Sequence, residues 1–540
     1  MKIRHMIHFG IRHFIDLTEE GELRPYSSFL PDDITYYRFP IKKCSVPESL
    51  EGMYRILDRI NELKQQGGFI YIHCRDGVTR TGVVAACYLA KQHDKQTLHD
   101  VIDALNFHSS WMFTSSRPNV SLTQEQLDFI EGFIASVRFR KEGDLNRIGD
   151  CIRGSLMGGA AGDALGYPVE FMDRQSILSE YGSSGIKTFE LDRSGKALVS
   201  DDTQMSLFTA NGILMGITRG YMRGIGGEPE NYVDGAYVDW YYTQTGEKRE
   251  DKNYDFHYTW LRDLPELAHR RAPGNTCLRA CSDILHNRKV ENNSKGCGGI
   301  MRVAPLALML AGYMVRDGRC PYSITDMFEA GAHIARVTHL HPLGFLPAGM
   351  LTELLFKLVP LSLEEAKERI AEIAEKTVKT LDKVFVGEYA GEKRFLAELT
   401  RKAIRLAQSS TADYLAIEEL GEGWTGEEAW AISLFCAIRH IDSIHDAIVA
   451  SVNHNGDSDS TGSITGNIMG AIYGYEEIKR QRLFCPNDKN FEDTIELANI
   501  ILAIADDLTT GCIISEYAPI DTPAQKQWFE RYCEMIPAGL

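Results

Sequence analysis

Hydrophobic and polar positions follow two different patterns along this chain. In the first 135 residues, short runs rich in aromatic and β-branched residues predict strands over 12–17, 35–41 and 68–72. Amphipathic stretches at 51–65 and 81–92 predict helices between and after these strands. Strands that alternate with helices are typical of an α/β sheet, so the N-terminal part is predicted to be a small α/β domain.

From residue 152 onward the hydrophobic period is helical almost throughout. Long segments at 363–385, 426–441 and 491–508 predict helices, and no run of alternating residues predicts a sheet. The second, larger part of the chain is therefore expected to be all-α.

The charged segment Arg138–Asp150 separates the two patterns. A chain of 540 residues also exceeds the roughly 100–200 residues of one domain. We predict a first domain over 1–138, a linker over 139–147 and a second domain over 148–540.

Two predicted helices carry glycine at every fourth position. The stripes are Gly154, Gly158, Gly162 and Gly166, and Gly462, Gly466, Gly470 and Gly474. Each interior glycine costs a helix about 1 kcal/mol relative to alanine, so such stripes are expected where backbones pack closely. We predict that both helices pack tightly, with packing against each other as one arrangement and glycines in loops as the alternative.

Charge is distributed unevenly between the two parts. Residues 1–140 carry 17 Lys and Arg against 17 Asp and Glu, so the net charge of −17 belongs to residues 141–540. This excess argues against non-specific nucleic-acid binding, although carboxylates gathered around a cation would also produce it. The apolar stretch Val303–Val315 is shorter than the ~20 residues of a membrane span, and the start of the chain lacks a signal-peptide core. We expect a cytoplasmic protein with no membrane partner.

The twelve cysteines show no metal-binding spacing and are expected to be reduced thiols, but Cys74 has a distinctive setting. It follows the strand 68–72 and precedes a helix, so the loop between them aims backbone N–H groups at one point, which suits an anion. The helix terminus and Arg80 would lower the pKa of a thiol there and create a thiolate nucleophile. Arg80 can hold two phosphate oxygens, and the Thr81 hydroxyl can assist turnover of a thiophosphate. These three residues are predicted to be catalytic.

The Cys-x5-Arg-Thr arrangement of Cys74–Gly82 resembles the protein tyrosine and dual-specificity phosphatase family. The likeness runs from about Gly10 to Gln126. It includes Arg117-Pro118 and Gln126, which match the stretch where such proteins place a water-orienting glutamine. The resemblance implies a cysteine phosphatase fold in the first domain.

One position departs from that family. An aspartic general acid usually comes soon after the residues that match Pro40-Ile41, where this chain has Lys42-Lys43-Cys44. Asp76 inside the loop, or Asp32 and Asp33 before the strand, could substitute, but all three are more typical of surface or loop residues. Phosphate binding is therefore better supported than phosphatase turnover.

Two acidic clusters lie at predicted helix starts. They are Ser200–Gln204 and Asn453–Thr461, and both combine hydroxyls with carboxylates. Ser and Asp are preferred at any helix N-cap, which is one interpretation. Oxygen ligands of this kind also bind hard cations such as Mg²⁺, so a metal centre built from both clusters is the other.

Several segments together resemble the ADP-ribosylglycohydrolase family over about residues 148–515. They are 158–171, 200–204, 294–302, 338–339 and 455–461, and 421–429 adds a likeness to the dinitrogenase reductase-activating branch. The resemblance implies an all-helical domain with two Mg²⁺ (or Mn²⁺) ions. The implied metal ligands are Ser200, Asp201, Asp202, Asp457, Asp459 and Ser460.

The same resemblance implies a catalytic carboxylate and a substrate pocket. Glu170 matches a residue near the metal centre that could position or deprotonate a water. The loop Gly296–Gly299 offers backbone N–H groups to a pyrophosphate, with Cys297 as a small loop residue. For His339, helix packing is the alternative to a ribose contact, and for Trp424 packing is the alternative to bordering the nucleotide. The implied substrate-binding residues are Asp163, Gly296, Gly298, Gly299, His339 and Trp424.

We therefore expect a bifunctional enzyme, with a phosphatase-like domain and a hydrolase that releases ADP-ribose from a modified protein, nucleic acid or small molecule. Its partners would be the ADP-ribosylated substrate and a phosphorylated ligand at the N-terminal domain, with nucleic acid only as a modified substrate. One alternative is a cysteine phosphatase with a helical ADP-ribose sensor, and another is a pair of binding modules. Intact metal ligands with Glu170 favour hydrolysis, and Lys43 favours binding in the first domain.

Overall fold

The structure is a computed structural model of the chain, which divides into two compact units, Met1–Asp144 and Leu145–Leu540. The segment predicted as a linker, 139–147, is helical and belongs to α5 (Gln124–Gly166), so the chain crosses the boundary as helix. The residues described are 2–23, 26–75, 78–92, 97–110, 122–224, 226–247, 258–317, 320–486, 489–514 and 520–533.

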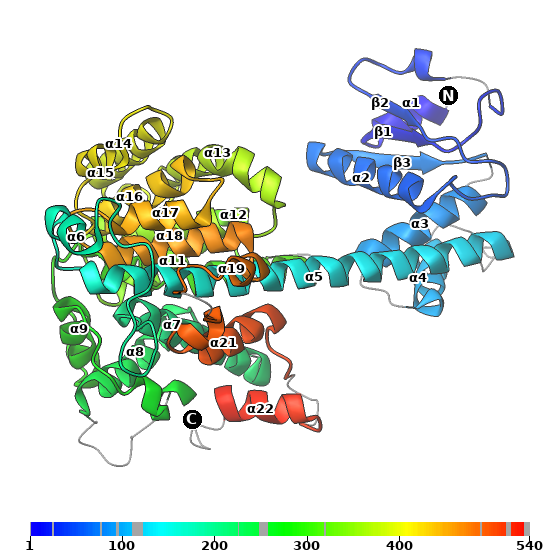
Figure 1. Cartoon of the computed structure of the whole chain (residues 1–540). Helices are drawn as coiled ribbons and strands as arrows, with labels where there is room; N and C mark the ends of the chain where they lie inside the picture. The colour runs from blue at the N-terminus through cyan, green and yellow to red at the C-terminus, as the bar shows by residue number, and fades with distance from the viewer. Residues whose placement is uncertain are drawn as a thin grey trace. The chain divides into compact units, whose positions relative to one another are not determined.

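The first unit contains a three-stranded parallel sheet, which confirms the predicted α/β fold. The strand order is β2-β1-β3, and in the central strand the successive residues Phe14 and Ile15 are both buried. This burial is expected for a parallel sheet covered on both faces. The elements are α1 (Lys2–His8), β1 (Ile11–Asp16), η1 (Ser27–Phe29), β2 (Thr35–Arg38), α2 (Leu50–Gln66), β3 (Phe69–His73), α3 (Thr79–Gln92), α4 (Leu98–Ser110) and the first part of α5 (Figure 1).

Parallel pairing places the loops that follow the strands at one edge of this sheet. Phe14 of β1 lies opposite Tyr36 of β2 on one side and Tyr71 of β3 on the other. The loop after β1 and the loop that begins with Cys74 after β3 therefore leave the sheet from the same edge.

The second unit is helical, as predicted, and no β-strand occurs among its described residues. The helices after α5 include η2 (Tyr167–Val169), α6 (Arg174–Tyr181), α7 (Asp201–Arg223), α8 (Glu230–Thr245), η4 (Trp260–Asp263), η5 (Pro265–Leu267), α9 (Asn275–Leu285), η6 (Cys297–Gly299), α10 (Ala304–Asp317), α11 (Ile324–Arg336), α12 (Pro342–Leu358), α13 (Leu363–Leu381), α14 (Ala390–Ala407), α15 (Asp413–Leu420), α16 (Gly426–Arg439), α17 (Ile444–Val452), α18 (Ser458–Tyr473), α19 (Tyr475–Gln481), α20 (Phe491–Thr494), α21 (Ala498–Thr510) and α22 (Pro523–Tyr532).

The glycine stripes of α5 and α18 face each other, and Figure 1 shows α18 alongside the C-terminal part of α5. A Cβ added to Gly158 would lie 2.5 Å from the carbonyl oxygen of Gly466, and one added to Gly162 would lie 2.0 Å from that of Gly462. A methyl group would therefore overlap the partner backbone, and only glycine permits this spacing. The prediction that the two helices pack tightly against each other is confirmed.

The helix predicted over 491–508 is wrong in one respect, because it is broken in two. α20 ends at Thr494 and α21 begins at Ala498, with Leu497 between them at a φ of 62°. The break follows from a tertiary contact: the N–H of Ala197 donates to the Thr494 carbonyl at 2.8 Å, and Ala197 forms an isolated bridge with Ile495.

The segment Cys297–Arg316 is long and apolar enough to cross a membrane by length and composition alone, and an 18-residue stretch of it has a mean hydropathy of 1.5. The segment contains η6 and most of α10, and 89% of that 18-residue stretch is buried inside the structure. Such burial is characteristic of a core helix.

Candidate active sites

The two acidic clusters come together at the starts of two helices. Ser200 is the N-cap of α7 and accepts a hydrogen bond from the backbone N–H of Asp202 at 3.2 Å. Asp457 is the N-cap of α18 and accepts from the N–H of Ser460 at 3.2 Å. Helix N-termini favour negative charge, so both positions stabilise carboxylates. The capping interpretation is therefore correct, and it does not exclude the metal interpretation.

Glu170 reaches these clusters because α5 packs so closely on α18. A Cβ added to Gly166, the last residue of α5, would lie 2.3 Å from the carbonyl oxygen of Ser458. The short helix η2 then leads directly to Glu170. Glu170 is 8% exposed, and its Oε2 is buried without a hydrogen-bond partner. The glycine stripe thus delivers the predicted catalytic carboxylate to the start of α18.

Buried carboxylates in this region raise one another's pKa. Burial raises the pKa of Glu170 to about 9, and the charges of Asp457 and Asp201 add to the effect. Burial and neighbouring carboxylates raise the pKa of Asp201 to about 8. The same causes hold the pKa values of Asp202 and Asp459 well above the usual range. At neutral pH such a group of carboxylates must either take up protons or be balanced by cations.

The cluster has the donors that a hard divalent cation prefers. Asp202 Oδ2 and Glu170 Oε2 are both buried without hydrogen-bond partners. No three Asp, Glu, His or Cys side chains in the described ranges are already arranged as a metal cage. The donors therefore fit Mg²⁺ or Mn²⁺ in kind, and cation binding would have to draw them together. The predicted ligands Ser200, Asp201, Asp202, Asp457, Asp459 and Ser460 are all buried.

Asp163 holds the start of α7 in place by hydrogen bonds. This role differs from the prediction that it binds substrate. It is fully buried and accepts hydrogen bonds from the N–H of Ser200 at 2.9 Å and of Thr203 at 3.1 Å. The hydroxyl of Thr203 donates to it as well. Asp163 therefore fixes the first turn of α7 to α5, and its carboxylate is not open to a ligand.

The loop Gly296–Gly299 contacts both His339 and the acidic cluster. A Cβ added to Gly296 would lie 3.2 Å from His339 Nε2, and one added to Gly298 would lie 3.0 Å from His339 Cε1. The thiol of Cys297 donates to Asp457 Oδ2 at 2.7 Å. The structure therefore brings together the predicted substrate loop, His339 and a predicted metal ligand.

Two exposed aromatic rings stack beside this loop. The ring centroids of Phe171 and Trp424 lie 5.9 Å apart with an interplanar angle of 20°. Phe171 is 77% exposed and Trp424 is 38% exposed. The carbonyl of Trp424 accepts from the N–H of Cys297 at 3.2 Å, which ties the pair to the loop. Sequence analysis missed Phe171, because its motif position next to Glu170 gives no sign of its exposure.

In the first unit, Cys74 follows β3 at the edge of the sheet where the loops gather. It is 5% exposed, and α3 begins shortly after it at Thr79. Asp76 and Gly77 lie outside the described residues. The Nε of Arg80 and the hydroxyl of Thr81 are buried without hydrogen-bond partners. Buried donors in this state suit an oxyanion ligand.

The terminal nitrogens of Arg80 are held by Glu22, a residue that sequence analysis missed. Nη1 donates to Oε2 at 2.7 Å and Nη2 donates to Oε1 at 2.6 Å. Nη1 also donates to the backbone carbonyl of Ile41 at 2.9 Å. The hydrogen bonds from Arg80 lower the pKa of Glu22 to about 2. No motif marks Glu22, and its only signal is its place after β1, in a loop that shares the sheet edge with Cys74.

The turn that carries Lys43 in place of an acid is exposed and held by polar contacts. The N–H of Lys43 donates to Glu19 Oε2 at 3.3 Å. Gln126 Nε2 donates to the carbonyl of Ser45 at 3.0 Å. Residues 117–118, the other part of this family match, lie outside the described residues. The structure thus places Gln126 against the turn.

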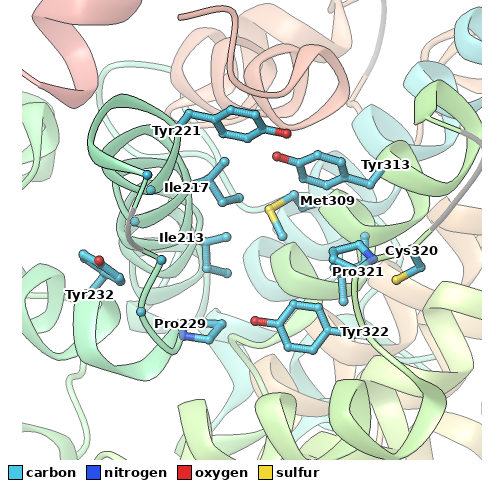
Figure 2. Close-up of a pocket in the computed structure, with 16 residues that line it drawn as sticks. Ile213, Ile217, Tyr221, Pro229, Tyr232, Met309, Tyr313, Cys320, Pro321 and Tyr322 are labelled. Carbon is cyan, nitrogen blue, oxygen red and sulfur yellow. The ribbon is translucent and has the colours of Figure 1, made fainter. Parts of the chain in front are cut away.

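A separate cavity of about 600 Å³ opens in the second unit beside α7 and α10. Figure 2 shows the hydroxyl groups of Tyr221 and Tyr313 facing each other at one end of it. Its lining is largely apolar, with Ile213, Ile217 and Met309 among the labelled residues. None of the predicted site residues lines this cavity, so it is not part of the acidic site.

Two family profiles match the chain, one over each unit. Residues 144–512 match the ADP-ribosylglycohydrolase family. Residues 1–126 match the family described as Swiss Army Knife protein, DSP-PTPase phosphatase domain. Both resemblances predicted from the motifs are therefore confirmed.

Curated relatives agree with these assignments. ADP-ribosylhydrolase ARH3 of Bos taurus is 24% identical over 219 residues, which cover 37% of this chain and 56% of that protein. ADP-ribosyl-[dinitrogen reductase] glycohydrolase of Rhodospirillum rubrum is 23% identical over 335 residues, covering 60% of this chain and 86% of its own. A sequence named as a tyrosine phosphatase, 067L of Invertebrate iridescent virus 3, is 38% identical over 86 residues, 15% of this chain and 35% of its own. With a phosphatase-family domain at its N-terminus, the chain belongs to the ADP-ribosylglycohydrolase family.

Proposed function

We propose that the second unit is a metal-dependent hydrolase that cleaves the glycosidic bond at C1 of the distal ribose and releases ADP-ribose. The substrate is an ADP-ribosylated protein, nucleic acid or small molecule. The observation that carries this proposal is the buried acidic cluster at the starts of α7 and α18, which Glu170 joins with an unpartnered oxygen. The carboxylates of such a cluster are all ionised near pH 7 only when cations balance their charge, and cations beside an ionised carboxylate suit hydrolysis.

Different residues of the chain have separate roles in this reaction. Two Mg²⁺ or Mn²⁺ ions held by the six predicted ligands would lower the pKa of a water and orient the ribose hydroxyls. Cations beside Glu170 would oppose the rise in its pKa, so that its ionised Oε2 can accept a proton from the attacking water. The backbone N–H groups of Gly296–Gly299 hold the pyrophosphate, and the stacked rings of Phe171 and Trp424 offer a flat surface to the nucleotide base.

The first unit is proposed to bind phosphate esters and to hydrolyse them slowly. Cys74 is the nucleophile, Arg80 holds the phosphate, and Thr81 assists hydrolysis of the thiophosphate. Two observations support weak turnover. Glu22 already holds the terminal nitrogens of Arg80, and Lys43 stands where an acid is expected.

The decisive experiment offers the full-length protein a panel of ADP-ribose conjugates linked through arginine, serine, a nucleic-acid base and a terminal phosphate. Free ADP-ribose is quantified with Mg²⁺, with Mn²⁺ and with excess chelator. We expect release from at least one conjugate, and its loss in chelator. Release that is equal in chelator, or no release from any conjugate with either metal, would overturn the proposal.

A further inference from the structure

Arg302 is a fully buried cation whose hydrogen bonds go to uncharged groups. Its Nη2 donates to the hydroxyl of Thr338 at 2.6 Å, and its Nη1 lies 3.5 Å from the sulfur of Cys277. Its guanidinium carbon lies 4.3 Å from the centre of the Tyr237 ring. Within the described part of the chain, no carboxylate forms an ion pair with Arg302. Burying a guanidinium is costly, so the hydrogen bond that Arg302 donates to Thr338 is an important contact.

The same hydroxyl of Thr338 also contacts the ring of His339. Its Oγ1 lies 2.8 Å from His339 Nδ1. A guanidinium can only donate, so Oγ1 accepts from Arg302 and its own proton points elsewhere. The hydroxyl proton of Thr338 points away from the Arg302 cation. It is donated to His339 Nδ1, because the other nearby acceptor, the sulfur of Cys277, is weak. Nδ1 therefore accepts, and the proton of the neutral ring is on Nε2.

The Nε2 of His339 faces the glycine loop. A Cβ added to Gly296 would lie only 3.2 Å from it. His339 is 2% exposed. Burial and the charge of Arg302 lower the pKa of His339 to about 3, so the ring is neutral near pH 7. An N–H on Nε2 at this place offers a hydrogen bond to an oxygen that is held by the loop.

We propose that Arg302 and Thr338 are positioning residues that fix His339 as the Nε2–H tautomer, so that a neutral donor meets an oxygen of the ligand at Gly296–Gly299. The ligand group is a hydroxyl or phosphate oxygen of the ADP-ribosyl moiety, which rests on the proposed function. A group that can only donate is excluded from this position, because two donors would face each other. Arg302 thus determines, without touching the substrate, that the pocket presents a hydrogen-bond donor at this position.

The test reads the tautomer directly in the full-length protein with ¹⁵N-labelled histidine. The signals of His339 are assigned by their loss in His339→Gln. We expect a protonated Nε2 and an unprotonated Nδ1 in the wild type and in Thr338→Ser, which keeps the hydroxyl. Thr338→Val has nearly the same shape but no hydroxyl, so its nitrogen shifts should move towards a mixture of tautomers. Calorimetry with ADP-ribose should show affinity lowered about 10-fold in Thr338→Val and changed less than about 2-fold in Thr338→Ser.

Two results on the tautomer would overturn the proposal. One is a wild-type His339 protonated on Nδ1, and the other is a Thr338→Val variant with wild-type nitrogen shifts. Equal losses of affinity in the Val and Ser variants, with lowered melting temperatures, would show a merely structural role and also contradict it. The tautomer is measured without catalysis, so the expected shifts in a protein that hydrolyses no conjugate would contradict only the proposed function.

Discussion

Glu22 holds both terminal nitrogens of Arg80, with N···O distances of 2.7 and 2.6 Å, in the loop region where the predicted phosphate site lies. Glu22 is itself fixed, because its Oε2 accepts from the N–H of Glu19 at 3.2 Å. A carboxylate and a phosphate both use the forked geometry of a guanidinium. A phosphate ligand that binds Arg80 in this way must therefore displace Glu22.

Replacing Glu22 by glutamine should strengthen phosphate binding, because an amide cannot form the charged, two-bond pair. Hydrogen bonds to charged groups contribute about 1.5–3 kcal/mol each, so the inhibition constant of inorganic phosphate should fall about 10-fold or more. The constant is measured by competition against an activated aryl phosphate. Glu20→Gln is the matched control, because Glu20 is exposed and should leave the constant unchanged. Weaker binding in Glu22→Gln would show that Glu22 helps to hold the ligand.

The pH dependence gives a second check on the Glu22→Gln prediction. The hydrogen bonds from Arg80 lower the pKa of Glu22 from 4.5 to about 2. A lowered carboxyl pKa means that the pair is present above the ordinary pKa and is lost only as pH falls through about 2. The gain from Glu22→Gln should therefore be the same from about pH 5 to 8. A gain that vanishes at the acidic end would contradict this assignment.

Sequence periodicity predicted the close packing of α5 on α18 but not the irregularities of the second unit. Glycine at every fourth residue of α5 and α18 has a backbone cost that only close contact offsets, so the contact between Gly158 and Gly466 follows from the pattern. The break at Leu497 depends instead on the pairing of Ile495 with Ala197, which is distant in sequence. A local pattern carries no information about such a partner.

The same distinction applies to the candidate sites. The acidic motifs predicted which carboxylates gather, because helix N-caps and family motifs fix their positions along the chain. They did not predict that both oxygens of Asp163 accept hydrogen bonds from the start of α7, that Phe171 is exposed, or that Glu22 forms an ion pair with Arg80. Each of these features depends on how an element is oriented against a distant one.

Gly158→Ala should destabilise the second unit. The added methyl would lie 2.5 Å from the carbonyl oxygen of Gly466, and backbone in a packed helix pair cannot move aside as a side chain can. Overpacking typically costs 1–3 kcal/mol, so a loss of about 3 kcal/mol is expected in the free energy of unfolding. Denaturant unfolding followed by tryptophan fluorescence measures it. The control is Gly391→Ala in α14, where nothing lies within 4 Å of the added Cβ and stability should hold or rise slightly.

Asp457→Asn should weaken metal binding and lower the activity, because the centre loses a charged ligand while the amide keeps the cap of α18. We expect ADP-ribose release to fall at least about 100-fold and Mn²⁺ binding, measured by calorimetry, to weaken at least about 10-fold. Asp173→Asn is the matched control, since Asp173 caps α6 and is exposed. A variant at 457 with normal metal affinity would exclude this carboxylate as a ligand.

Glu170→Gln should lower the turnover rate more than substrate affinity. The amide preserves the shape of the side chain and removes the oxygen that accepts a proton, so kcat should fall about 10²–10⁴-fold. KM should change little, because Glu170 is not expected to hold the substrate in its ground state. Single-turnover measurements on a competent conjugate separate the two effects. An unchanged kcat would remove Glu170 from the mechanism.

The first unit lacks an acid at the turn after β2, and this has a chemical consequence. Lys43 there is exposed, and its backbone N–H donates to Glu19. When the thiolate of Cys74 attacks phosphorus, the leaving oxygen takes the electron pair of the P–O bond. An aryl oxygen of low pKa can leave in that state, whereas an alkoxide needs a proton from a general acid, a contribution of about 10²–10⁴-fold.

Hydrolysis by this unit should therefore depend steeply on the leaving group. We expect slow turnover of activated aryl phosphates and almost none of alkyl phosphates, with Cys74→Ser abolishing both because it removes the thiolate. Lys43→Asp should raise the alkyl rate if the turn still presents its side chain to the leaving oxygen. Rates across phosphates graded by leaving-group pKa, in the wild type and both variants, test this expectation. A flat dependence in the wild type would mean that another residue supplies the proton, and the site would then be a full phosphatase, because an enzyme that protonates its leaving group no longer depends on the acidity of that group.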